Sequence, residues 1–243
     1  MEKTALITGA SRGIGKAIAT AFAKAGYSLS LCCQNSGDIL NIFAEQLKND
    51  CHVRVLTFTG DVGDAPFVQE MLIRTLDTFG HLDVLINNAG ISYIGLLTDM
   101  DITDWNRIVS VNLNSVFLTC RHAVPSMVLA KSGRIINISS VWGCMGASCE
   151  VAYSACKGAV NAFTKALGKE LAPSNICVNA IACGVIDTDM NHCFSREELD
   201  SLTEEIPAGR MGMPEEVAQL TLSLVSSPSY LNGQVITLDG GWI

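Results

Sequence analysis

Two side chains able to move a proton stand four residues apart in the second half of the chain, Tyr153 and Lys157. Both fall within Ala152–Leu171, a predicted helix, and positions i and i+4 lie on one helix face. A phenol has an unperturbed pKa of about 10, which is too high for efficient proton exchange near neutrality. A neighbouring ammonium favours the phenolate and lowers that pKa. The pair is therefore typical of a proton donor to an oxygen that gains negative charge. Taken alone, the spacing also fits a half-buried ring beside a solvated amine.

A glycine pattern near the start of the chain is suited to binding phosphate. The segment Thr8-Gly9-Ala10-Ser11-Arg12-Gly13-Ile14-Gly15 follows an apolar run and opens a predicted helix. Gly9 permits a tight turn, and Gly13 and Gly15 permit close approach of the backbone to a pyrophosphate. The helix start adds unpaired N–H groups and a positive dipole. In this context the motif indicates a dinucleotide site, and the alternative is an ordinary glycine-rich turn.

Strand-like apolar runs alternate with helical patterns along the whole chain. The predicted strands are Thr4–Thr8, Ser28–Cys33, Arg54–Phe58, Val84–Ile86, Arg134–Ile138, Val178–Ile181 and Val235–Leu238. The predicted helices are Gly15–Ala25, Ile39–Lys48, Ala65–Phe79, Asp104–Ala130, Ala152–Leu171 and Pro214–Val225. Such alternation predicts a parallel sheet with helices on both faces, and near-continuous apolar strands agree. Because no linker or repeat divides the chain, we expect one α/β domain over residues 1–243, a doubly wound fold with a seven-stranded parallel sheet.

Further motifs follow the glycine turn in a fixed order. Asp61-Val62 and Asn87-Asn88-Ala89-Gly90 follow the third and fourth predicted strands, Asn112 stands in a predicted helix, and Ser140 follows the fifth strand. With the G-x-x-x-G-x-G spacing, these motifs resemble the short-chain dehydrogenase/reductase family over nearly the whole chain. The resemblance implies a Rossmann fold and hydride transfer between a nicotinamide and a carbonyl or secondary alcohol. It also implies a catalytic tetrad of Asn112, Ser140, Tyr153 and Lys157.

The resemblance gives each predicted site residue a role. Ser140 would hydrogen-bond the carbonyl oxygen as charge develops there, Lys157 would hold the nicotinamide ribose, and Asn112 would hold a water that passes protons to Lys157. Without the resemblance, Ser140 would be read as a turn or cap residue and Asn112 as a partner of nearby backbone. The implied cofactor-binding residues are Gly9, Ser11, Arg12, Gly13, Ile14, Gly15, Asp61, Val62, Asn88, Ala89, Gly90, Tyr153, Lys157, Gly184, Ile186 and Thr188. Relatives usually have Pro where this chain has Cys183, so we expect a less constrained backbone there.

The end of the second predicted strand favours NADP over NAD. NAD enzymes commonly place an acid there, on the adenosine ribose, whereas this chain reads Ser30-Leu31-Cys32-Cys33-Gln34-Asn35. Arg12, in the glycine turn, could reach a 2′-phosphate, although a solvated turn residue would look the same. Gln34 departs from many NADP-binding relatives, which carry a second Arg near this point.

Composition excludes several other classes of function. The net charge of -8 argues against a nucleic-acid partner. The chain has no apolar run long enough for a transmembrane helix and no secretory pattern at its start, so we expect a cytoplasmic protein with no membrane partner. Its ten cysteines show no ligand spacing. We therefore expect small buried hydrophobes rather than disulfides or a metal site, including at Cys144, Cys149 and Cys156 near the predicted tetrad.

The whole chain most resembles 3-oxoacyl-[acyl-carrier-protein] reductases. Ile206-Pro207-Ala208-Gly209-Arg210 and the Asp239-Gly240-Gly241 ending point in that direction. The resemblance implies a 3-oxoacyl thioester substrate and a place in fatty acid biosynthesis. Two alternatives stay open because fold does not fix function. One is a dehydrogenase of a small or cyclic secondary alcohol, sugar or steroid. The other is a cofactor-sensing protein without turnover, which the intact tetrad disfavours.

Three expectations concern partners and moving parts. Residues 184–213, with a possible short helix at Arg196–Glu204, are expected to form a substrate lid. The resemblance implies a homotetramer, and the long apolar helices agree with symmetric association. A docking patch for an acyl-carrier protein could be formed by Lys131, Arg134, Lys165 and Lys169. Against docking, carrier-protein reductases often have an Arg where this chain has Ser174.

Overall fold

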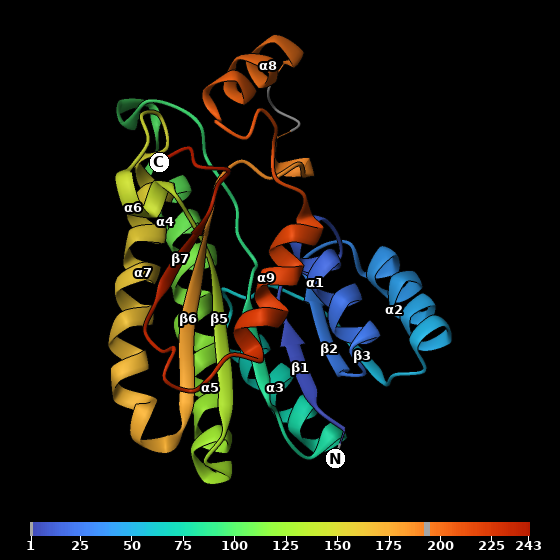
Figure 1. Ribbon diagram of the computed structural model, residues 1–243. Coiled ribbons are helices and arrows are strands. Elements are labelled where there is room, and N and C mark those ends of the chain that lie inside the picture. The colour runs from blue at the N-terminus through green and yellow to red at the C-terminus, as the bar shows by residue number, and fades with distance from the viewer. Residues whose placement is uncertain (1, 192–194) are drawn as a thin grey trace.

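A parallel sheet of seven strands forms the centre of the molecule, seen in the computed structural model of Figure 1, which describes residues 2–191 and 195–243. The strands are β1 (Thr4–Ile7), β2 (Ser28–Cys33), β3 (Val55–Thr59), β4 (Val84–Asn87), β5 (Gly133–Ser140), β6 (Ile176–Cys183) and β7 (Val235–Leu238). Their order is β3-β2-β1-β4-β5-β6-β7, and all pairs are parallel. The predicted doubly wound, seven-stranded α/β fold is confirmed. The strand order reverses between β1 and β4, and in such sheets ligands bind beyond the carboxyl ends of the strands at that point.

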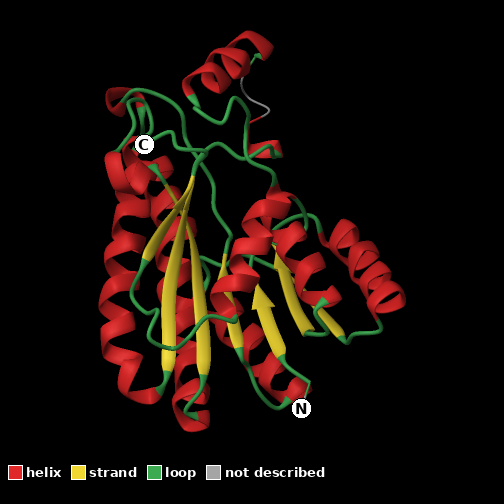
Figure 2. Ribbon diagram, viewed as in Figure 1, coloured by secondary structure: helices red, strands yellow, loops and turns green. Residues whose placement is uncertain are grey.

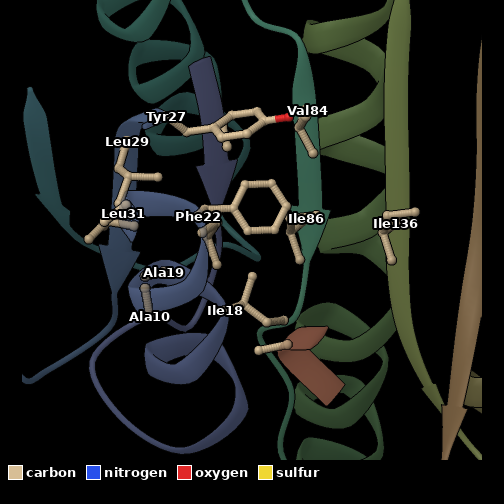
Figure 3. Packing of buried hydrophobic residues seen from close by; sticks show 14 of the residues in the cluster. Ala10, Ile18, Ala19, Phe22, Tyr27, Leu29, Leu31, Val84, Ile86 and Ile136 are labelled. Atoms are coloured by element: carbon tan, nitrogen blue, oxygen red, sulfur yellow. The ribbon is translucent and has the colours of Figure 1, made fainter. Parts of the chain in front are cut away.

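Helices cover both faces of the sheet, as Figure 2 shows. One layer contains α1 (Gly13–Lys24), α2 (Gly37–Cys51) and α9 (Pro214–Val225), and the other contains α3 (Ala65–Phe79), α5 (Ser115–Ala130) and α7 (Val151–Leu171). Successive strand side chains point to opposite faces, so Leu31 enters the first core and Cys32 the second. In the first core, Phe22 and Ile18 of α1 lie against Ile86 of β4 (Figure 3). This double burial explains why the strands read as continuous apolar runs.

The predicted helix Asp104–Ala130 is wrong as a single element. The structure has α4 (Ile102–Val109), a π-helical turn η2 (Ser110–Asn114) and then α5. The cause is Asn112, whose side-chain Nδ2 donates to the Ile108 carbonyl at 3.1 Å. That carbonyl, four residues back, is the one an α-helical N–H would take. An irregular turn of this kind is frequent at functional sites.

The predicted lid region contains two short elements, η4 (Asp189–Asn191) and α8 (Arg196–Glu205), while residues 192–194 lie outside the described part. A capping box starts α8, in which Ser195 and Glu198 bond each other's backbone N–H. α8 stands above the carboxyl end of the sheet in Figure 1, and none of its residues is buried. The remaining short elements are η1 (Leu97–Asp99), α6 (Trp142–Met145) and η3 (Ala172–Ser174). Among the described helices, none has the length and apolarity needed to cross a membrane.

Candidate active site

A cavity of about 490 Å³ opens at the carboxyl ends of the central strands. Its lining includes every predicted site residue except Gly15 and Asn112. The sequence motifs, spread from Gly9 to Thr188, are therefore brought to one place by the fold. The volume lies within the range of sites for small molecules and cofactors.

The glycine turn between β1 and α1 is shaped to receive a phosphate. Gly9 has φ +67°, a conformation that favours glycine, and a Cβ on Gly15 would lie 2.1 Å from the Gly9 carbonyl oxygen. Gly15 is thus needed for packing beneath the turn and does not line the cavity. No side chain caps the start of α1, and its first turn carries no acid. The N–H groups of that turn are available to an anion, so these residues fit the pyrophosphate of a dinucleotide.

Hydrogen bonds fix the glycine turn to the segment that follows β4. Thr8 Oγ1 accepts from the backbone N–H of Asn88 at 2.9 Å and of Ala89 at 3.0 Å. Asn88 Nδ2 donates to the carbonyls of Thr8 at 2.9 Å and Gly9 at 3.1 Å. The two walls on either side of the sheet's switch point are therefore held as one unit.

An ion pair that the sequence analysis missed lies at another wall of the cavity. Arg107 of α4 donates from Nη1 to Asp61 Oδ2, while Asp61 Oδ1 accepts the Gly63 N–H at 2.8 Å. The side chain of Gln34 lies 3.5 Å from the same carboxylate. Asp61 is one of the predicted cofactor residues, and Arg107 orients it. The pair joins residues 46 apart in sequence, and no local motif marks it.

Ser140, Tyr153 and Lys157 meet at the opposite side of the cavity. Ser140 ends β5, and its Oγ accepts the Trp142 N–H at 3.2 Å and is also hydrogen-bonded to Tyr153. Tyr153 and Lys157 project from one face of α7, with Lys157 Nζ 5.5 Å from the centre of the Tyr153 ring. Lys157 Nζ donates to the Ile138 carbonyl at 2.8 Å.

Burial governs the protonation of these groups. It lowers the pKa of Lys157 to about 8, because an ammonium is poorly solvated there. It also raises the pKa of Tyr153 above its ordinary value, and the hydrogen bond from Ser140 acts in the opposite direction. The expected lowering of the Tyr153 pKa by Lys157 is not seen in this structure, because the cost of burying a phenolate outweighs other effects. Burial likewise raises the pKa of the neighbouring Cys183 thiol to about 12, so this sulfur is neutral at pH 7.

Asn112 is buried behind the cavity rather than in it. Its Nδ2 donates to the Ile91 carbonyl at 2.8 Å, and its Oδ1 accepts the Ile91 N–H at 3.1 Å. With the bond to the Ile108 carbonyl, both the nitrogen and the oxygen of the side-chain amide are hydrogen-bonded to backbone. The structure thus supports the backbone-bonding interpretation of this side chain, and holding a catalytic water stays a prediction.

The backbone after β6 is more regular than the missing proline suggested. Cys183 still belongs to the strand, its carbonyl accepts the Val141 N–H at 2.9 Å, and the next N–H, of Gly184, donates to Leu238 at 2.9 Å. Further on, Ile186 pairs with Gly212 as an isolated bridge at the base of the predicted lid. The expectation of a less constrained segment at Cys183 is therefore wrong, because strands on both sides hold it.

The cysteines near the tetrad differ in their surroundings. Cys156 is buried in a small cluster with Ile108 and Ala152, whereas Cys144 is exposed and Cys149 is partly exposed. All cysteines in the described part of the chain are free thiols. The packing interpretation thus holds for Cys156 but not for Cys144.

Two tryptophans and two polar residues also line the cavity and were not predicted. Trp142 of α6 and Trp242 near the carboxyl end contact each other edge-to-face, with ring centres 4.9 Å apart. Ser92 and Glu150 lie in the same lining. Only Trp242 had a local signal, since it directly follows the Asp239-Gly240-Gly241 motif. The others are brought together by contacts between distant segments.

Comparison with known proteins gives a consistent result. The family model for short chain dehydrogenases matches residues 3–199. The uncharacterized oxidoreductase YmfI of Bacillus subtilis (strain 168) is 40% identical over 243 residues, which cover 100% of this chain and 99% of the relative. A 3-oxoacyl-[acyl-carrier-protein] reductase of Synechocystis sp. is 42% identical over 245 residues, covering 99% of this chain and 97% of the relative. The reductase FabG of Aquifex aeolicus, described by the same activity, is 39% identical over 240 residues, covering 98% and 96%.

A solved structure agrees over the entire length. The NADPH-dependent reductase YwfH, involved in bacilysin biosynthesis, superimposes with a TM-score of 0.95 and 29% sequence identity, covering 100% of this chain and 99% of that one. Both the sequence matches and the structural match extend across the pocket and the sheet. The chain belongs to the short-chain dehydrogenase family of oxidoreductases.

Proposed function

We propose that the protein catalyses the NADPH-dependent reduction of a carbonyl to a secondary alcohol, and that its substrate is a 3-oxoacyl thioester. The observation that carries this proposal is the placement of Ser140, Tyr153 and Lys157 in the same cavity as the uncapped glycine turn. Bound NADPH supplies the hydride that adds to the carbonyl carbon. The relatives described as 3-oxoacyl-[acyl-carrier-protein] reductases support the thioester.

The protein's own groups act on the carbonyl oxygen. The Tyr153 hydroxyl, which its raised pKa keeps protonated near neutrality, donates a proton to the oxygen as the hydride arrives. Ser140, already hydrogen-bonded to Tyr153, stabilises the charge that develops on that oxygen. Lys157, with a pKa of about 8, is mostly an ammonium at pH 7 and adds positive charge beneath the phenol.

Lys131 and Arg134 of the predicted docking patch for an acyl-carrier protein lie at the end of the sheet opposite Ser140. Lys131 ends α5 and Arg134 is at the amino end of β5, whereas Ser140 is at the carboxyl end. Six strand residues separate the two ends by roughly 20 Å, from the rise of about 3.3 Å per residue. The element near the cavity mouth is α8, whose sequence Arg-Glu-Glu-Leu-Asp-Ser-Leu-Thr-Glu-Glu is strongly acidic. An acidic carrier protein would be repelled there, so it is not expected to dock on α8, and docking at the lysine patch stays a prediction.

The proposed function is tested by comparing acetoacetyl-CoA with cyclic ketones and their alcohols, each with NADPH or NADP. Rapid reduction of acetoacetyl-CoA is expected. The second candidate, a cyclic secondary alcohol dehydrogenase, is favoured by one observation, the aromatic wall of Trp142 and Trp242, against which a flat ring can stack. Turnover of a cyclic ketone without turnover of the thioester would select it.

Arg12 is proposed to favour NADPH. The residue lines the cavity with the acid-free stretch Cys33–Ser36, and its guanidinium lies 3.7 Å from Asp189 across the opening. Arg12→Ala should weaken NADPH binding about tenfold and NADH binding less than twofold, because one surface-exposed charge-assisted contact contributes about 1.5 kcal/mol. Fluorescence titration of the reduced nicotinamide measures both constants. An equal loss for the two cofactors would refute the assignment.

A homotetramer is proposed from the family resemblance and from apolar side chains left in solvent. Ile102 is 71% exposed and Leu129 88%, and Phe117 is also exposed, all on α4 and α5. Contacts between copies would bury such side chains. Light scattering at micromolar concentration should give a mass four times that of one chain, and a single-chain mass would contradict the proposal.

A further inference from the structure

A carboxylate that the proposed reaction does not use lies in the wall of the cavity. Glu150 directly precedes α7 and lines the cavity with Ser140 and Tyr153. One of its oxygens, Oε2, accepts the hydroxyl of Ser92 at 2.6 Å. Among the described residues, no cation lies within salt-bridge distance of it. No ion pair within the described part of the chain therefore offsets the negative charge of Glu150 at the cavity wall.

The position of Glu150 is fixed from two sides. Ser92 follows Ile91, whose N–H and carbonyl are both held by the buried side chain of Asn112. Near the other end of the same loop, the Gly95 N–H donates to the Cys149 carbonyl at 2.9 Å, immediately before Glu150. These contacts hold the backbone on both sides of the Ser92–Glu150 hydrogen bond, so Glu150 stays at this wall of the cavity. A rigid group of this kind discriminates between ligands because it cannot move away from an unsuitable one.

The described basic groups that line the cavity form no ion pair with Glu150. Arg12 is paired with Asp189 and Arg107 with Asp61, in the cofactor half. The Lys157 ammonium is directed at the Ile138 carbonyl. The influence of Glu150 on the reacting group is already visible, because its charge helps to raise the pKa of Tyr153. A substrate oxygen bound to Tyr153 would place its neighbouring atoms within the same field.

We propose that Glu150 is a specificity-determining residue whose negative charge excludes carbonyl substrates bearing a carboxylate close to the reacting group. A free 3-oxo acid carries a negative charge two carbons from the carbonyl that is reduced, whereas its thioester or ester is neutral at that position. The carboxylate of such an acid and the carboxylate of Glu150 would repel each other in this partly buried site. The site is thereby restricted to neutral acyl derivatives. The inference rests on the proposed function and names the substrate class more closely.

A matched pair of small substrates tests the charge directly. Ethyl acetoacetate and acetoacetate share the reacting carbonyl and differ in charge, and neither carries the phosphates of coenzyme A. We expect the parent protein to prefer the ester in kcat/KM with NADPH. Glu150→Gln keeps the size and an oxygen for Ser92 but removes the charge, so the ester-to-acid ratio should fall at least tenfold, mainly through a lower KM for acetoacetate.

Ser92→Ala is the matched control. It removes the partner hydroxyl and leaves the carboxylate, so the ratio should change less than threefold. A general disturbance of α7 or of Tyr153 would slow both substrates alike and leave the ratio unchanged. If Ser92→Ala lowers the ratio as much as Glu150→Gln does, shape rather than charge sets the preference and the inference is wrong.

A binding measurement separates this inference from the proposed function. In a Tyr153→Phe background saturated with NADPH, nicotinamide fluorescence reports binding of the two compounds without turnover. If the parent protein reduces neither these compounds nor acetoacetyl-CoA, the proposed function fails, but a tenfold fall in the binding ratio on Glu150→Gln would still support the role of Glu150. A ratio unaffected by Glu150→Gln, or no binding of either compound, overturns it.

Discussion

Tyr153→Phe should lower kcat for carbonyl reduction by two to four orders of magnitude, the range general acid catalysis contributes. The substitution keeps the ring packed in its buried place on α7 and removes only the hydroxyl that gives up the proton. NADPH affinity should change less than threefold, because the ring is retained. Steady-state kinetics and fluorescence titration of bound NADPH measure the two quantities on one sample.

Ser140→Ala provides a comparison for this variant. It deletes the partner hydroxyl of Tyr153 without touching the proposed proton donor. A loss of up to a few hundredfold is expected, since one hydrogen bond to the developing charge is removed. Reduction by Tyr153→Phe at more than a tenth of the parent rate would exclude Tyr153 as the donor.

Lys157→Met should abolish most turnover and yet make the protein harder to unfold at pH 7. The pKa of Lys157 is about 8 in the folded protein against a reference of 10.5. The folded state thus binds this proton less tightly than the unfolded state, so stability is lost as the pH falls from about 10.5 to 8. Below that window the buried ammonium costs about 3 kcal/mol, at 1.36 kcal/mol per pH unit. Methionine has no such cost.

Part of the stability gained by Lys157→Met is offset by a lost hydrogen bond. Lys157 Nζ donates to the Ile138 carbonyl, and methionine would leave that oxygen without this donor. An unsatisfied buried acceptor costs about 1–3 kcal/mol. We expect a net gain of about 1 kcal/mol in the free energy of unfolding by urea at pH 7. The advantage should disappear at pH 10, where the parent lysine is neutral in the folded state. A variant less stable than the parent at both pH values would show that the folded protein does not disfavour the ammonium.

Elements whose signals are local could be predicted from the sequence. α3 and α9 have the predicted bounds, because α3 begins after Asp64 and ends at Gly80, and Pro214 opens α9. The phosphate turn was found because its glycines, the preceding strand and the helix start are contiguous. β5 and β6 are longer than predicted, and in β6 the buried Cys177 carries less apolar weight than its packing shows.

What escaped prediction depends on contacts between distant segments. The π turn contains Asn112, whose side chain bonds Ile91, twenty-one residues earlier. The Glu150–Ser92 contact spans 58 residues, and neither residue has a recognisable motif. The direction of the Tyr153 pKa shift follows from the poor solvation of a phenolate at this place in the fold. A helical spacing shows which residues share a face, but it does not show how much water reaches that face.

The placement of Trp242 affects how the protein should be purified. Trp242 packs on Trp142 at the cavity wall, and the adjacent Ile243 N–H is bonded to Asp239 at 3.0 Å. Anything fused after Ile243 therefore emerges beside the opening, whereas the amino end lies at the opposite end of the strands (Figure 1). An affinity tag on the carboxyl end would compete with substrate for space and alter apparent KM values. The same tag on the amino end should leave the kinetics unaltered.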